Sequence, residues 1–236
     1  MNIFAHRGYS GRYPENTMLA FEEAVASGAQ GIELDVHLSK DGKLVIIHDE
    51  LLIRTTGVAG SVQDYTLDEL VGINAGKPFC DMFDHTPIPS FEQYCTYIRD
   101  KDIISNVEIK TNIQYYEGIE EALTEMARKF DIGEKVLFSS FNWLSAVKIR
   151  ELNPHIPCGL LFEDRSLRHI AYQAKSMGFA FVHPGKNLID QEMVDECKEL
   201  GIALNVWTVN DKESLDRLVR WEVDGIITNH PPTCLP

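Results

Sequence analysis

The sequence predicts a (β/α)8 barrel, in which eight parallel strands are surrounded by helices. Two observations lead to this prediction: short β-branched runs alternate with amphipathic stretches along the chain, and an Asp-Gly turn folds one run back on its predecessor. Repeated strand–helix units imply a parallel sheet, and at 236 residues a closed barrel is the natural solution. We find no linker and no clear repeat, so we expect one domain over residues 1–236.

Nine short apolar runs are the strand candidates, since buried parallel strands read as such runs. They are Asn2–Ala5, Gly31–Leu38, Lys43–His48, Ile104–Ile109, Val136–Phe138, Gly159–Phe162, Ala180–Val182, Leu204–Val206 and Gly225–Ile227. Helix-like segments fill the intervals near 17–27, 91–100, 116–130, 143–152, 166–177, 191–200 and 212–222. Start signals support them: Asn16, Asp190 and Asn210 suit N-caps, and Ser90 and Thr66 each open a capping-box pattern.

The Asp41-Gly42 dipeptide explains why there are nine runs rather than eight. Asp-Gly is a strong signal for a two-residue hairpin, and so short an interval cannot form a parallel crossover. We therefore expect the run 43–48 to be an antiparallel return on the second strand. A turn centred on Asp41-Gly42 would place His48 opposite Asp35.

Residues 51–89 form an unusually long connection, with only one short capped helix predicted, around 66–71. Compact domains rarely contain such a connection unless it is a lid or a binding element. We expect either a surface excursion or an insertion over the barrel mouth.

Composition narrows the possible functions. Lys and Arg number 22 against 36 Asp and Glu, a net charge of −14, which argues against a nucleic-acid or anionic-membrane surface. No apolar run approaches the roughly 18 residues of a membrane span, and no signal peptide is evident. The five cysteines are scattered and have no zinc spacing. We expect a cytoplasmic protein without stable membrane insertion, and a homo-oligomer is left open.

Three carboxylates on neighbouring barrel strands are the main chemical signal. Glu33 and Asp35 alternate along one strand, so they share a face about 7 Å apart at 3.3 Å per residue. Glu108 and Lys110 repeat this arrangement on the next barrel strand. Simple surface charge, or a structural Glu108–Lys110 bridge, would be the plain explanation. Together, however, the three carboxylates suit an all-oxygen site for Mg²⁺ or Ca²⁺, with Lys110 free to meet an anionic ligand.

His6 and Arg7 end the first strand, at the carboxyl-terminal face where barrel active sites form. The Arg7 guanidinium offers a bidentate fork for phosphate. A lone histidine at a strand end is more often structural, but the hairpin brings His48 to the same rim. Two imidazoles beside a metal and a phosphate-binding Arg suit acid–base cleavage of a phosphodiester, one accepting a proton and one donating it.

Three other side chains carry weaker signals. Asn16 is explained as a helix cap, although its position at the rim also permits a substrate contact. Trp207, near the end of the seventh barrel strand, is a candidate for stacking on an apolar part of the substrate or for filling the core. His37 follows Asp35 on the same face, and we interpret it mainly as a rim residue.

Taken together, these motifs resemble the glycerophosphodiester phosphodiesterase family across essentially the whole chain. The matching segments are His6-Arg7-Gly8, Pro14-Glu15-Asn16-Thr17, Glu33-Leu34-Asp35, Lys40-Asp41-Gly42, His48-Asp49, Arg54-Thr55-Thr56, Val107-Glu108-Ile109-Lys110, Val206-Trp207-Thr208-Val209-Asn210 and the closing segment 224–231. Asn229 stands where many members have Asp. We expect this departure to affect a strand-end polar contact and no core role.

The resemblance implies a phospholipase-C-like barrel that hydrolyses glycerophosphodiesters, such as glycerophosphocholine or glycerophosphoethanolamine, to sn-glycerol 3-phosphate and an alcohol. It implies roles for seven residues: metal ligands Glu33, Asp35 and Glu108, the acid–base pair His6 and His48, and phosphate contacts Arg7 and Lys110. It leaves open which histidine is the acid, and whether water or the substrate's own glycerol hydroxyl attacks.

Two rival interpretations remain. A related phospholipase-type phosphodiesterase acting on lysolipids or inositol lipids would need an apolar ridge at the mouth, whereas the 51–89 insertion is acidic. Its acidic residues are Asp64, Asp68, Glu69, Asp81 and Asp84. A non-catalytic metal- or phosphate-binding barrel would be expected to lack one of the histidines or carboxylates.

Overall fold

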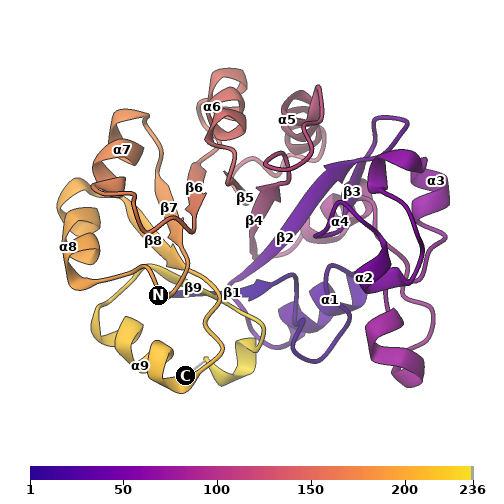
Figure 1. Cartoon of the computed structure of the whole chain (residues 1–236), viewed down its shortest axis with the longest axis horizontal. Helices are drawn as coiled ribbons and strands as arrows, with labels where there is room; N and C mark the ends of the chain where they lie inside the picture. Colours follow the sequence, from indigo (N-terminus) through magenta and orange to yellow (C-terminus); the bar gives the residue numbers. More distant parts are fainter. Residues whose placement is uncertain (235–236) are drawn as a thin grey trace.

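Eight parallel strands close into a barrel, as the sequence predicts (Figure 1). The structure is a computed structural model that describes residues 1–234, apart from the side chains of Cys80 and Asp81. The barrel strands are β1 (Asn2–His6), β2 (Gly31–Leu38), β4 (Ile104–Ile109), β5 (Val136–Ser140), β6 (Cys158–Phe162), β7 (Phe181–Pro184), β8 (Ala203–Val206) and β9 (Gly225–Thr228). β1 pairs in parallel with both β9 and β2, and this double pairing closes the sheet on itself.

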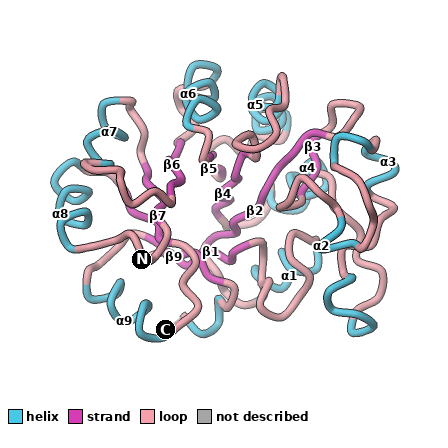
Figure 2. The backbone as a smooth tube through the Cα atoms, viewed as in Figure 1, coloured by secondary structure: helices cyan, strands magenta, loops and turns pink. Residues whose placement is uncertain are grey.

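Helices cover the outside of the barrel (Figure 2). The longer ones are α1 (Met18–Ala26), α4 (Phe91–Ile98), α5 (Ile119–Lys129), α6 (Trp143–Leu152), α7 (Ile170–Ser176), α8 (Gln191–Leu200) and α9 (Lys212–Arg220). The last turn of the chain, η3, spans Pro231–Thr233. α7 begins four residues later than predicted. The Asp164 carboxylate accepts a hydrogen bond from the Ser166 amide and holds this stretch in a turn.

Three of the predicted helix starts are confirmed and two are wrong by one residue. Asp190, Ser90 and Thr66 are N-caps, whereas α1 is capped by Thr17 and α9 by Asp211. Asn16 and Asn210 are not available as caps because their side chains bond elsewhere, to Asp35 and to the β9 end respectively.

The hairpin forms as predicted, but its register is shifted by one residue. β3 (Leu44–Ile46) runs antiparallel to β2 and, within residues 1–234, pairs with no other strand, so it lies outside the parallel set. His37 lies opposite Val45 and Leu38 opposite Leu44. The turn has three residues rather than two and ends at Gly42, whose φ of 71° is the left-handed conformation such loops require.

This shift overturns the predicted pairing of Asp35 with His48. The carbonyl of Asp35 instead accepts a hydrogen bond from the amide of Ile47, at 3.1 Å. His48 therefore follows the pairing as the first residue of the next loop, still beside the barrel mouth.

The 51–89 connection folds into short helices beside β3, on the right-hand side of Figure 1. They are α2 (Ile53–Thr56), η1 (Val62–Asp64), α3 (Leu67–Leu70) and η2 (Lys77–Met82). A small second core joins this connection to β3 through Val45, Ile47, Leu52, Val62, Leu70, Ala75 and Ile88. The predicted acidic position Asp81 lies outside the side chains that the structure describes.

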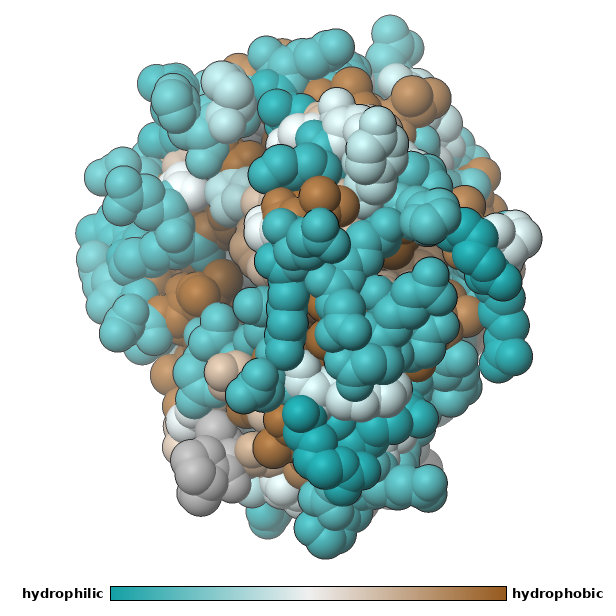
Figure 3. Space-filling view, turned by 90° about the vertical axis from the view of Figure 1, so that its left-hand side faces the viewer, coloured by the Kyte–Doolittle hydropathy of each residue, from teal (hydrophilic) through white to brown (hydrophobic). Residues whose placement is uncertain are grey.

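The outer surface is polar over much of its area. The face in Figure 3, which includes the α7 and α8 side, is mostly hydrophilic, and its apolar side chains form small separate groups. Within residues 1–234, no helix combines the length and the apolar character that a bilayer span requires.

Candidate active site

Strand register brings the predicted site residues together at the carboxyl ends of the barrel strands. In the β1–β2 pair, His6 is the partner of Glu33, and in the β2–β4 pair, Asp35 is the partner of Glu108. Side chains alternate along a strand, so Glu33 and Asp35 emerge on one face. Three neighbouring strands therefore concentrate acidic and imidazole groups at one point.

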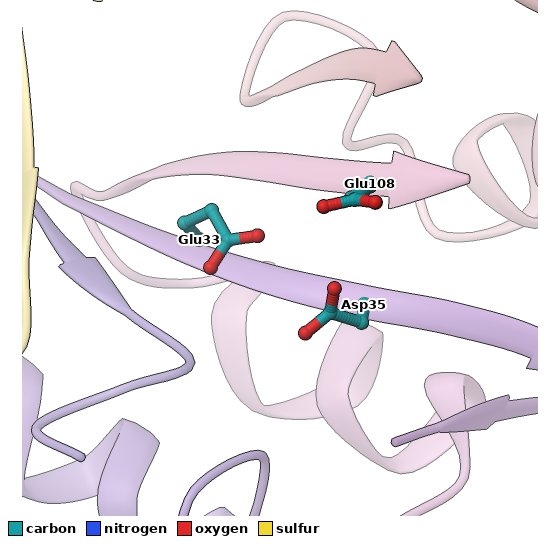
Figure 4. A group of neighbouring side chains, drawn as sticks. All are labelled: Glu33, Asp35 and Glu108. Atoms are coloured by element: carbon teal, nitrogen blue, oxygen red, sulfur yellow. The ribbon is translucent and has the colours of Figure 1, made fainter. Parts of the chain in front are cut away.

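The three carboxylates converge as predicted (Figure 4). Glu33, Asp35 and Glu108 are all buried, and each offers an oxygen within 4.8 Å of the other two. Among the described residues, no other group of three or more His, Cys, Asp or Glu side chains has ligand atoms within 4.8 Å of one another.

The electrostatics of this group favour an added cation. Burial, together with the neighbouring negative charges, raises the pKa of Glu33 well above its usual value and also raises the pKa of Glu108. Burial alone would raise the pKa of Asp35 too, but Lys110 and other nearby positive groups lower it. No described residue donates a hydrogen bond to the buried Oδ1 of Asp35. Three hard oxygen donors, one of them unpartnered, fit a divalent ion such as Mg²⁺ or Ca²⁺.

Lys110 and Arg7 border the carboxylates. The Lys110 ammonium donates to Glu108 Oε1 at 2.9 Å and lies 3.6 Å from Asp35 Oδ1, so in this arrangement it is paired rather than free. Arg7 donates through its backbone amide to Glu33 and through its guanidinium to Glu15, at 3.0 and 2.9 Å. Both cations line the cavity next to the carboxylates.

His6 is held by a residue that sequence analysis did not connect with it. Its Nδ1 lies 2.6 Å from the amide oxygen of Asn229, so Nδ1 carries the proton and donates. Nε2 is then directed toward Glu33, 3.9 Å away. Burial, with the Arg7 charge, lowers the pKa of His6 to about 4. Asn229 thus makes a polar contact at a strand end, as expected, and its partner in that contact is His6.

His48 has a different anchor. Its Nδ1 donates to the carboxylate of Asp49 at 2.6 Å, and its Nε2 lies 3.3 Å from the Lys110 ammonium. The side chain is 28% exposed, so it borders the cavity rather than the barrel interior.

Arg54 links the surroundings of His48 to those of Arg7 through two carboxylates, Asp49 and Glu15. It donates to Asp49 at 2.5 and 3.1 Å and forms a bidentate pair with Glu15, both bonds at 2.8 Å. Because Glu15 also binds Arg7, alternating charges run from Arg7 to His48. Sequence analysis recognised these residues only as motif letters, since their contacts span up to 39 positions.

Two weaker predictions require correction. Asn16 is buried and donates to Asp35 Oδ2 at 2.7 Å, so it supports a carboxylate and does not line the cavity. His37 is fully buried rather than at the rim. Its Nε2 donates to the carbonyl of His48 and its Nδ1 accepts from the Tyr116 hydroxyl, at 3.1 and 3.0 Å. Burial lowers the pKa of His37 to about 4, so the ring is neutral and ties the His48 backbone to the next loop.

A cavity of about 380 Å³ opens beside these groups and has two unlike sides. One side presents Glu33, Glu108, the two cations and the two histidines, and the other is largely apolar. The apolar side consists of Ile113, Phe141, Leu161, Trp207 and Ile227. Trp207 lines this cavity and also packs against a small buried cluster, so its position fits both of the roles considered for it. Phe141 and Glu163, which also line the cavity, were missed, although both directly follow barrel strands.

Comparison with known proteins now gives the family. The model of the glycerophosphoryl diester phosphodiesterase family matches residues 6–233. The chain belongs to this family. A glycerophosphodiester phosphodiesterase of Caldanaerobacter subterraneus is 41% identical over 99% of this chain and 96% of the relative. One from Bacillus altitudinis is 39% identical over 97% of this chain and 94% of the relative.

Solved structures agree with this family assignment. An Oleispira antarctica phosphodiesterase, in complex with the product sn-glycerol-3-phosphate, superposes with a TM-score of 0.85 at 27% identity, covering 99% of this chain and 95% of that one. A glycerophosphodiester phosphodiesterase from Thermotoga maritima gives 0.80 at 29% identity, covering 99% and 96%. The barrel described above is therefore the fold of the glycerophosphoryl diester phosphodiesterase family.

Proposed function

We propose that this protein hydrolyses glycerophosphodiesters, such as glycerophosphocholine and glycerophosphoethanolamine, to sn-glycerol 3-phosphate and an alcohol. The observation that carries the proposal is the convergence of three buried carboxylates, two cations and two anchored histidines at one site, where all of these groups except Asp35 line a single cavity. The names of the two relatives, and the sn-glycerol-3-phosphate in the Oleispira antarctica structure, support the choice of substrate.

Glu33, Asp35 and Glu108 would hold one divalent cation, Mg²⁺ or Ca²⁺. When bound, such an ion supplies Lewis-acid stabilisation of the charge that develops on the phosphoryl oxygens. Arg7 and Lys110 add positive charge at the same point, and the Arg7 fork can bind two phosphate oxygens together.

We assign the proton-accepting role to His6. Its lowered pKa, about 4, leaves the ring neutral near pH 7, and the bond to Asn229 keeps Nε2 unprotonated and free to accept. The attacking oxygen, from water or from the substrate's glycerol hydroxyl, would lose its proton to this atom. His48, held through Nδ1 by Asp49, would enter the step with a second proton on Nε2 and give that proton to the leaving alkoxide, while His6 keeps the proton of the attacking oxygen.

We also propose that residues 1–236 form one domain and that the 51–89 connection borders the mouth through Arg54. The bonds from Arg54 to Asp49 and Glu15 support this. Acting on small-molecule diesters, the protein would need neither nucleic acid nor membrane insertion.

The direct test measures glycerol 3-phosphate release from a panel of glycerophosphodiesters, before and after EDTA treatment. We expect turnover that EDTA abolishes and that added Mg²⁺ or Ca²⁺ restores. Absence of release from every diester, in metal-supplemented and correctly folded protein, would overturn the proposal.

A further inference from the structure

The apolar side of the cavity contains two aromatic rings in contact, those of Phe141 and Trp207. The rings of Phe141 and Trp207 meet edge to face, with centroids 5.7 Å apart and planes at 88°. The indole N–H of Trp207 donates to the carbonyl of His183 at 2.8 Å, which fixes the ring and leaves that N–H unavailable to a substrate. This side therefore offers π-electron faces and methyl groups, with no free hydrogen-bond donor from Trp207.

A further carboxylate, Glu163, lines the cavity apart from the three convergent ones, because it follows β6, which lies between β5 and β7, whereas the three come from β2 and β4. Glu163 directly follows β6, is exposed and lines the same cavity as Phe141 and Trp207. Within residues 1–234, its carboxylate takes part in none of the side-chain hydrogen bonds or ion pairs described, whereas Arg7 and Lys110 are engaged by Glu15 and Glu108. Glu163 thus gives the apolar side an uncompensated negative charge.

The two arms of a glycerophosphodiester differ in what they require. The glycerol arm has two free hydroxyl groups, which lose hydrogen bonds to water unless polar groups replace them. Arg7, Lys110, Glu33 and Glu108 offer such groups on the charged side of the cavity. A trimethylammonium group requires the opposite surroundings, because its positive charge is covered by methyl groups that make no strong hydrogen bonds. Aromatic faces and a nearby carboxylate are the surroundings that bind such cations.

We infer that Phe141, Trp207 and Glu163 form a subsite for a cationic head group, which favours choline-type glycerophosphodiesters over neutral or acidic ones. This inference rests on the proposed function and adds a substrate preference to it. A neutral glycerol head group would gain nothing from Glu163, and a serine head group would bring its own carboxylate toward it.

The decisive experiment compares kcat/KM for glycerophosphocholine with kcat/KM for the neutral glycerophosphoglycerol. We expect wild-type protein to prefer glycerophosphocholine, and we expect Glu163→Gln to reduce that preference about fivefold, the scale of one partly exposed ion pair. The matched control is Asp164→Asn, which removes the neighbouring exposed charge that lines a different cleft. It should leave the preference unchanged.

Three further measurements separate the contributions of charge, shape and the aromatic face. Choline should inhibit the wild type more strongly than 3,3-dimethylbutanol, its uncharged isostere, and Glu163→Gln should remove that difference. Raising the salt concentration should weaken the choline preference, because salt screens exposed charges. Trp207→Leu keeps an apolar side chain without the π face, and it should also lower the preference.

The outcomes distinguish this inference from the proposed function. Equal kcat/KM values for all head groups, or an unchanged preference in Glu163→Gln, would overturn the subsite alone. Faster hydrolysis of lysophosphatidylcholine than of glycerophosphocholine would mean that the apolar side receives an acyl chain, and would also overturn it. Failure to hydrolyse any glycerophosphodiester would overturn the proposed function itself.

Discussion

His48 donates a hydrogen bond of 2.6 Å to Asp49, its neighbour in the chain. His6 forms a bond of the same length, but to the neutral amide of Asn229, 223 positions away. The two imidazoles of the site are therefore anchored by chemically different partners. This difference supports dividing the accepting and donating roles between them.

Removing the Asp49 anchor should slow turnover without weakening substrate binding much. In Asp49→Ala, the His48 ring loses the acceptor that orients it, and Arg54 retains only Glu15. Loss of such a supporting partner typically costs about 10- to 100-fold in activity. We expect kcat to fall by that amount with KM nearly unchanged, and Asp49→Asn to recover part of the loss. Asp100→Ala, which removes an exposed carboxylate bonded to Arg99, is the control and should behave as wild type. A purely structural role for Asp49 would give a lower melting temperature with unchanged kcat.

Replacing either histidine should abolish most turnover while substrate binding persists. His6→Ala and His48→Ala each remove one proton-transfer group, which is typically worth about 10²–10⁴-fold in rate. The carboxylates and Arg7 are untouched, so glycerol 3-phosphate should still bind, as titration calorimetry can measure. The double variant should be far from additive if the two rings act in one step. Near-wild-type turnover in either folded single variant would contradict the two-histidine mechanism.

The three carboxylates should bind one divalent ion. Soaking crystals in Mg²⁺ or Ca²⁺ should place the ion among Glu33, Asp35 and Glu108, at oxygen distances of about 2.0–2.6 Å. Glu108→Gln keeps the size of the side chain but removes a charge, so we expect ion affinity and activity both to fall. Its matched control is Glu125→Gln, an exposed helix residue paired with Arg128. Density for the ion elsewhere, or full activity of Glu108→Gln in EDTA, would refute the assignment.

The features predicted correctly are those that depend on a few consecutive residues. Alternation along β2 and β4 is enough to place Glu33, Asp35 and Glu108 on one face, and strand ends mark His6 and Arg7. Local patterns could not predict contacts between distant segments. When the barrel closes, β9 lies beside β1 and brings Asn229 to His6.

The errors arose where one side chain could serve two partners. Asn16 has the chemistry of a helix cap, but its amide binds Asp35 while Thr17 caps the helix. The predicted hairpin register was wrong because Asp-Gly fits both a two-residue and a three-residue loop. His37 is buried against Tyr116, and His48 still lines the cavity despite the one-residue shift.

A buried histidine outside the proposed chemistry should make folding stability depend on pH. His183 is fully buried in the barrel, and burial lowers its pKa from 6.5 to about 3. Between those pH values the unfolded chain binds a proton at this ring and the folded protein does not. The free energy of unfolding must therefore fall as pH drops through this window, and it is independent of His183 above pH 6.5.

The size of the effect follows from the pKa difference. At 1.36 kcal/mol per pKa unit, acidification from pH 7.5 to 5 should cost about 2 kcal/mol through this one residue. Denaturant unfolding of wild type and His183→Gln at both pH values gives the comparison. We expect the wild type to lose about 2 kcal/mol more than the variant over this range, whatever the variant's absolute stability. Titrating carboxylates and the other histidines are common to both proteins, so they cancel in the difference. Equal losses in the two proteins would show that His183 becomes protonated in the folded state.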